Sequence, residues 1–301
     1  MNLKVMKCMA QRCGAGFALA LLLLPGGATA GEAVDTTLAM PADGLVRVEN
    51  LAGKVEFSAW DRAEVQVRGE TGDSVEELII RETANGILVE VRNHKNQRNI
   101  DGTDLYLRIP AGARIEGEGV SSDFLVRDNR GESIEIRTVS GDLEIEAETG
   151  RLELNSVSGD IEFVGRAERA SVEAVSGDVT LSGLNGEVKV STVSGDLSLE
   201  SGDISRGQFE SVSGELRLEL ALADEGRLSC ESMSGDVEIR LPAAQEAAFS
   251  AQSYSGSIRS DFGEVARASR GPGSLLEAQI GANAARIRLE TFSGDIAIRG
   301  R

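Results

Sequence analysis

Carboxylate side chains recur at regular intervals in the second half of the chain, and they are the groups with the clearest capacity for chemistry. They end a repeated Ser-Gly-Asp motif, with Glu replacing Asp in one copy, at Asp142, Asp160, Asp178, Asp196, Glu215, Asp236 and Asp295. The first four are 18 residues apart. If each repeat forms one coil of a stack, neighbouring carboxylates lie ~5 Å apart along one edge. That spacing is short enough for Ca²⁺ to bind between coils.

The motif nevertheless favours a structural turn over a calcium site. Calcium-binding β-rolls use a Gly-Gly-x-Gly-x-Asp nonapeptide, whereas here one Gly and one Asp recur every 18 residues. Gly adopts positive φ without a Cβ clash, and Ser and Asp can hydrogen-bond turn amides locally. We therefore predict no cofactor and no metal, with calcium on the Asp column as the alternative. The predicted turn residues are Gly141, Asp142, Gly159, Asp160, Gly177, Asp178, Gly195, Asp196, Gly214, Gly235, Asp236, Gly294 and Asp295.

The other reactive side chains form no catalytic set in the sequence. Cys230 falls at a position that is apolar in other repeats, which indicates a buried small residue rather than a nucleophile. His94 lies in a polar segment without partners for a triad or a metal site. Carbohydrate-active enzymes combine paired carboxylates with aromatic platforms, but the Trp and Tyr residues, Trp60, Tyr106 and Tyr254, are far apart in sequence. We predict that the protein is not an enzyme, and a polysaccharide-active enzyme is the remote alternative.

A large apolar residue precedes each Ser-Gly pair, and a small residue precedes that one. The large residues are Val139, Val157, Val175, Val193, Val212, Met233, Tyr254 and Phe292. If the small residues point inward at a narrow corner, strict alternation points the large ones outward, as a possible interaction stripe. The alternative is that the chain bends at the corner and buries them.

The spacing of these motifs predicts the architecture that positions them. Apolar residues alternate with polar ones on both sides of each motif, as in Leu143-Glu144-Ile145, which is typical of β-strands. Two strands and two turns fit each 18-residue repeat, and a fixed period of this length indicates stacked coils. We predict an all-β fold, a parallel β-solenoid of ~18-residue coils with two strands per coil and an N-terminal β cap.

The N-terminus has the layout of a secretory signal peptide. Three basic residues precede a short apolar run, which ends in Pro25 and the small-residue site Ala28-Thr29-Ala30. The run is too short to span a membrane, so we expect no membrane-spanning segment in the mature chain. Cleavage would change the formal net charge from −18 to −21, because the first 30 residues contain three basic groups and no acid. Such a charge disfavours nucleic acid as a partner.

The chain therefore divides into three predicted parts. Residues 1–30 form the signal peptide, residues 31–117 the N-terminal β cap region, and residues 118–301 the Ser-Gly-Asp solenoid. Within the solenoid the pattern lapses at 262–284, which we interpret as a loop excursion before the last coil.

From about Leu45 to Arg299 the sequence resembles a bacterial family of exported β-strand-repeat proteins, the domain-of-unknown-function 4097 family, whose members are labelled adhesins. The resemblance rests on the serial Ser-Gly-Asp motifs, on Val46-Arg47-Val48-Glu49-Asn50 and on the closing segment from Leu289 to Ile296. It implies an exported β-solenoid and supplies no catalytic residues. We expect a non-catalytic module in the periplasm, outside the cell or at its surface, that binds an envelope protein or a glycan; the alternative is a periplasmic structural or stress-related scaffold that contacts another envelope protein.

Overall fold

The computed structural model describes residues 33–94, 101–267, 273–282 and 285–301. The predicted signal peptide lies outside these residues. The described residues form 21 β-strands joined in one continuous sheet, and they contain no helix long and apolar enough to cross a membrane. The first strands are β1 (Ala33–Ala39), β2 (Leu45–Trp60), β3 (Glu64–Glu70), β4 (Val75–Thr83), β5 (Gly86–Asn93), β6 (Asp104–Pro110), β7 (Arg114–Asn129) and β8 (Ser133–Ser140).

The strands of the repeat region follow. They are β9 (Leu143–Ser158), β10 (Ile161–Ser176), β11 (Val179–Ser182), β12 (Gly186–Ser194), β13 (Leu197–Ser213), β14 (Leu216–Ser234), β15 (Val237–Leu241), β16 (Ala247–Ser253), β17 (Ile258–Ser260), β18 (Val265–Arg267), β19 (Ser274–Ile280), β20 (Ala285–Ser293) and β21 (Ile296–Gly300).

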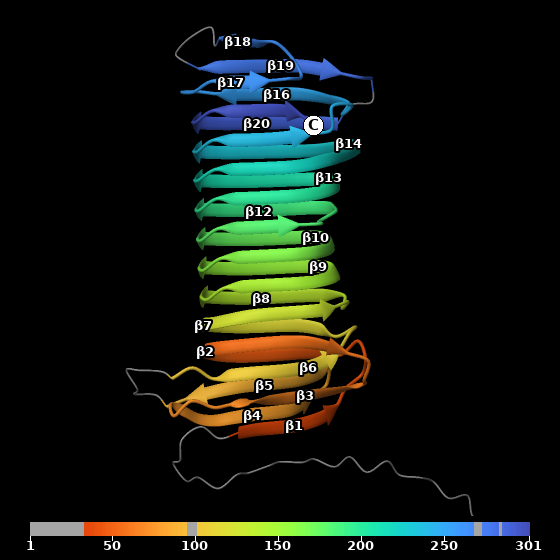
Figure 1. The fold of residues 1–301 in the computed structure, drawn as a ribbon, viewed down its shortest axis with the longest axis vertical. Coiled ribbons are helices and arrows are strands. Elements are labelled where there is room, and N and C mark those ends of the chain that lie inside the picture. Colours follow the sequence, from red (N-terminus) through yellow and green to blue (C-terminus); the bar gives the residue numbers. More distant parts are fainter. Residues whose placement is uncertain (1–32, 95–100, 268–272, 283–284) are drawn as a thin grey trace, which may run out of the picture.

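The sheet is wound into a parallel β-solenoid, as the 18-residue period predicted (Figure 1). Long strands such as β9 and β10 bend halfway and contribute to two facing layers. We call these the incoming layer, which leads into the Ser-Gly-Asp turns, and the outgoing layer, which leaves them. Ile161 pairs with Leu143 and Ala170 with Leu152, each 18 residues earlier. Equivalent residues of successive coils therefore stack directly on one another.

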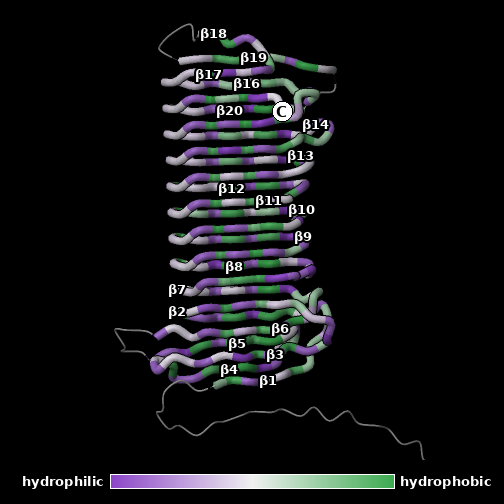
Figure 2. Tube along the Cα trace, in the orientation of Figure 1, coloured by the Kyte–Doolittle hydropathy of each residue, from purple (hydrophilic) through white to green (hydrophobic). Residues whose placement is uncertain are grey.

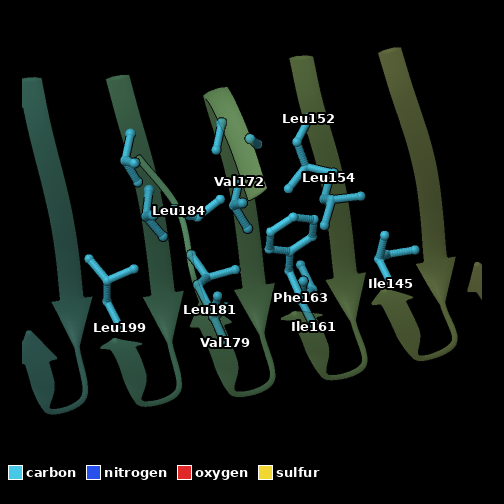
Figure 3. Close-up of a cluster of buried hydrophobic side chains, with 14 of the residues drawn as sticks. Ile145, Leu152, Leu154, Ile161, Phe163, Val172, Val179, Leu181, Leu184 and Leu199 are labelled. Carbon is cyan, nitrogen blue, oxygen red and sulfur yellow. The ribbon is translucent and has the colours of Figure 1, made fainter. Parts of the chain in front are cut away.

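The core lies between the two layers. Burial alternates along each strand because neighbouring side chains point to opposite faces, and Figure 2 shows the matching alternation in hydropathy. Figure 3 shows inward side chains from several coils in contact, with the ring of Phe163 among aliphatic neighbours that include Leu154 and Leu181. Phe163 is fully buried. The outward positions on the same strands are mostly charged or polar.

The N-terminal strands cover the first coil. Strand β2 pairs in parallel with β7 on one side and with β5 and β6 on the other. Antiparallel strands then end both layers, since β4 pairs with β5, and β1 pairs with β3, which pairs with β6. An antiparallel end offers no matching edge for another parallel coil.

At the other end the stacking order departs from the order in the chain. Strands β20 and β21 lie between β14/β15 and β16/β17, so the last coil in sequence is not the last coil in space (Figure 1). Strands β18 and β19 occupy part of segment 262–284, whose residues 268–272 and 283–284 lie outside the described ranges. Strand β19 pairs antiparallel with β16, and β18 pairs antiparallel with β19 and ends the incoming layer.

Candidate functional site

The Ser-Gly-Asp turns form one straight edge of the solenoid, on the left in Figure 1. Their glycines have positive φ, as the sequence predicted, for example 125° at Gly177 and 134° at Gly159. A Cβ atom on Gly177 would lie 2.2 Å from the carbonyl oxygen of Gly159 in the coil below. Both the backbone conformation and the close stacking therefore require glycine. The same conformation occurs at Gly141, Gly195, Gly214, Gly235 and Gly294.

The carboxylates of this edge form a ladder of hydrogen bonds between coils rather than within their own turns. The backbone amide of Asp178 donates to Oδ1 of Asp160 at 2.8 Å, and the amide of Asp196 donates to Oδ1 of Asp178 at 2.9 Å. We call this row the Asp ladder. Its acceptors are Asp123, Asp142, Asp160, Asp178, Asp196, Asp236 and Asp295.

The Asp ladder has a gap at Glu215. The Glu215 amide donates to Asp196 at 2.8 Å. Its longer carboxylate pairs with Arg217 instead, and within the described residues it accepts no hydrogen bond from the Asp236 amide of the next coil. The ladder resumes at Asp236 and ends at Ser257, whose amide donates to Asp295. Hydrogen bonds from the backbone and the side chain of Ser257 lower the pKa of the Asp295 carboxyl. In the described residues, no three His, Cys, Asp or Glu side chains are grouped so that they could hold a metal ion.

The apolar row beside the Asp ladder faces solvent. The alternative of burial at the corner is wrong, because the small residues before the row fill the corner and are themselves buried, as Thr138 and Ala174 show. We call the exposed row the apolar stripe. In stacking order it comprises Val120, Val139, Val157, Val175, Val193, Val212, Met233, Phe292 and Tyr254, whose exposed fractions run from 44% at Val120 and Val175 to 62% at Phe292.

Sequence analysis missed Val120 as a member of the stripe. Its turn reads Val-Ser-Ser-Asp, with Ser122 where the other turns have glycine. The 19-residue offset from Val139 and the shared Asp would have identified it. At the opposite end the stacking order brings Phe292 next to Tyr254, with ring centroids 6.1 Å apart.

A shallow groove of about 370 Å³ runs along part of the apolar stripe. The stripe residues Val139 to Val193 form one wall, the buried corner residues lie along its floor, and the outward side chains two positions earlier form the other wall. This second wall contains Arg137, Asn155, Glu173 and Ser191. The lining is therefore apolar along the stripe and polar along its rim.

The two isolated reactive side chains lie elsewhere. Cys230 is fully buried between coils, and burial raises the pKa of its thiol to about 12. A thiol in that environment is not a nucleophile near neutral pH. His94 is exposed, and its Nδ1 lies 4.0 Å from Oε2 of Glu76.

A parallel β-solenoid with a regular exposed apolar edge places this chain among the stacked-repeat proteins. The chain belongs to the Toastrack DUF4097 family, whose model matches residues 47–299. No curated protein matches the chain. It is similar to the crystal structure of a putative adhesin from Parabacteroides merdae, at a TM-score of 0.51 and 9% identity, over 89% of this chain and 96% of that one.

Two further solved structures are similar at lower scores. One is a putative adhesin from Bacteroides fragilis, with a TM-score of 0.45 and 10% identity over 89% of this chain and 97% of that one. The other is a putative lipid binding protein from Parabacteroides distasonis, with a TM-score of 0.49 and 11% identity over 88% of this chain and 96% of that one.

Proposed function

We propose that the protein is a non-catalytic binding module, exported to the cell envelope, which contacts its partner through the apolar stripe. The main observation behind this proposal is that nine large apolar side chains lie exposed in one unbroken row. A contiguous apolar surface with a polar rim commonly marks an interaction site. The partner class that this chemistry favours is an envelope protein rather than a glycan, and display at the cell surface would make the module an adhesin.

Three features support a non-catalytic role. The turn carboxylates recur from coil to coil and, apart from that of Glu215, accept backbone hydrogen bonds, so they serve the scaffold rather than one reaction centre. The Cys230 thiol is buried, and in the described residues the ion-pair partner of His94 is Glu76, at 4.0 Å. The stacked coils also form a rigid surface that contacts a partner at many equivalent points, each of which contributes weakly.

Protease accessibility in cells that produce the full chain tests the location. An adhesin is digested on intact cells, or it is found in the medium. Protection until the outer barrier is opened would overturn adhesion and leave the periplasmic scaffold as the function. A resident periplasmic protein, followed in the same samples, controls for leakage.

Photo-crosslinking in the same cells tests the contact surface. A photoreactive residue replaces Val175 in one variant and Val164 in another. Both valines lie on β10 with similar exposure, 44% and 46%, but Val164 is on the outgoing layer, away from the stripe. We expect a discrete crosslinked protein from position 175 and none from position 164. The same crosslinks from both positions, or none from 175 and from a second stripe position at Val193, would overturn the stripe as the binding surface.

A further inference from the structure

We propose that the apolar stripe binds a cationic amphipathic α-helix of a partner protein, with an apolar row flanked by Lys or Arg. This inference rests on the proposed function and specifies its partner. It follows from the spacing of the stripe residues and from the charges on both sides of them.

The spacing of the stripe matches a helix better than an extended strand. Stacked coils place successive stripe residues ~4.8 Å apart. On a helix, apolar residues that alternate at three and four positions advance ~5.3 Å on average, whereas same-face residues of a strand advance ~6.7 Å. Along eight intervals the helix drifts by about 4 Å, less than one coil, while the strand loses register within three coils. A stripe of nine residues is ~38 Å long, the length of a helix of about 26 residues.

Acidic side chains border the apolar stripe on both sides. The Asp ladder follows it around the turn, and a second column lies two residues before it on the incoming layer. The acids of this second column are Glu118, Glu173, Glu210, Glu231 and Glu290, and Arg137 is its basic member. Arginines compensate some of the acids, since Glu118 pairs with Arg47 and Glu290 with Arg288.

Four acids near the centre of the stripe have no ion-pair partner in the described residues. They are Glu173, which lines the groove, and Asp142, Asp160 and Asp178 of the adjacent Asp ladder, whereas Arg137 of the groove is paired with Glu153. A partner with basic residues on both sides of its apolar row would neutralise both borders. A second copy of this chain would instead bring acidic borders against acidic borders, which disfavours self-association through this surface.

We expect the apolar row of the helix to bind in the groove beside the stripe. It spans the coils of Val139, Val157, Val175 and Val193, where the buried floor residues are small. Leu or Ile side chains of the helix would fill it, and the stems of the flanking Lys or Arg would extend over the stripe toward the acids.

Binding of designed peptides to the full mature chain tests the inference. The first probe is a 26-residue helix with Leu at alternating three- and four-residue spacing and Lys on both sides of that row. The second replaces each Lys with Glu, and the third has the composition of the first in an order without an apolar face. We expect binding of the first, measured by fluorescence anisotropy, at least about tenfold tighter than that of the third, and no binding of the second.

Paired variants then locate the bound peptide. Val157→Ser combined with Val175→Ser is expected to weaken binding about tenfold through lost apolar contact, whereas Val164→Ser, at similar exposure on the other layer, leaves it unchanged. Asp160→Asn with Asp178→Asn keeps the acceptor oxygens of the ladder and removes two charges. It is expected to weaken binding at low salt and to reduce the salt dependence. Circular dichroism confirms that each variant retains its β-structure.

Several outcomes would overturn the proposal that a cationic helix binds the stripe. They are equal binding of the first and third peptides, equal loss in the stripe and Val164 variants, or tight binding of the Glu peptide. Self-association of the chain that the stripe variant abolishes would identify a second copy as the occupant. If crosslinking from Val175 in cells succeeds while no peptide binds, the binding module stands and the cationic helix is wrong. If both experiments fail, the proposed function fails as well.

Discussion

Replacement of Glu215 by Asp should repair the gap in the Asp ladder. The ladder bonds on either side both have a donor to acceptor distance of 2.8 Å, and the backbone register continues through the gap, since the Leu216 amide donates to the Asp236 carbonyl at 2.9 Å. One methylene fewer should therefore bring the carboxylate to the Asp236 amide.

The expected gain follows from the exposure of the site. One hydrogen bond to a charged acceptor contributes about 1 kcal/mol net, and loss of the exposed pair with Arg217 costs about 0.3 kcal/mol. The remaining gain of about 0.7 kcal/mol corresponds to roughly threefold slower exchange of the Asp236 amide and an increase in Tm of about 1–3 °C.

Amide hydrogen exchange, followed by NMR at Asp236, is the direct assay because it reports the turn itself rather than the whole solenoid. The reciprocal change Asp178→Glu is the matched control, and it should speed exchange at the Asp196 amide by a similar factor. Glu215→Ala removes the Arg217 pair without adding a ladder bond, so it should not protect Asp236. Unchanged exchange in Glu215→Asp, or equal protection in Glu215→Ala, would refute the ladder as a source of stability.

Three other predictions follow from the same geometry. Gly177→Ala should cost at least about 2 kcal/mol of unfolding free energy, since the new Cβ meets a carbonyl at positive φ; Gly150→Ala, without that φ, should cost clearly less in urea titrations, and equal costs would contradict the steric argument. Cys230 should resist thiol reagents in the folded chain and react after unfolding. Because its folded pKa is raised from 9.0 to about 12, its stabilising contribution is complete below pH 9 and is lost as pH rises toward 12, and Cys230→Ala should flatten that alkaline slope of urea stability. The lowered pKa of Asp295 gives the opposite sign: its contribution is present above its unfolded value and is lost as pH falls below it. Asp295→Asn should therefore reduce the acid sensitivity of stability, and an unaltered profile below pH 4 would contradict this.

The repeating coils were predictable from sequence because each coil solves the same local problem. A glycine permits the stacked turn, and alternating apolar residues fill the core between layers. An 18-residue period of these features is therefore enough to predict a stack of two-stranded coils. The exposure of Val139 and Val175 was not decided by the period, because an outward side chain at a corner can face solvent or fold back over the turn. The structure decides it through the small buried residues that already occupy the corner.

The direction of the Asp ladder also lay beyond the sequence. An Asp after Gly can accept a hydrogen bond from its own turn or from the next coil, and the motif is the same in both cases. The stacking distance selects the second, since it places the Oδ1 of Asp160 2.8 Å from the Asp178 amide. The direction of the ladder explains why Glu215 interrupts it and why Ser257 can stand at its end, which the residue types alone did not show.

Ser257 shows how position in the stack explains a departure from the motif. Each ladder carboxylate accepts a hydrogen bond from the amide of the next coil, and the Ser257 amide is the last one to donate such a bond, to Asp295. Beyond it lies antiparallel β19 rather than another Ser-Gly-Asp turn, so a carboxylate at position 257 would have no amide to bind. The sequence places this residue 38 positions before Asp295, but the inserted last coil makes it the end of the ladder. Antiparallel strands end the stack at β4, at β1 and at β18, so most of the exposed surface lies on the sides of the solenoid. In the described residues, nine of the 12 exposed large apolar side chains lie in the apolar stripe, which makes it the side most suited to contact.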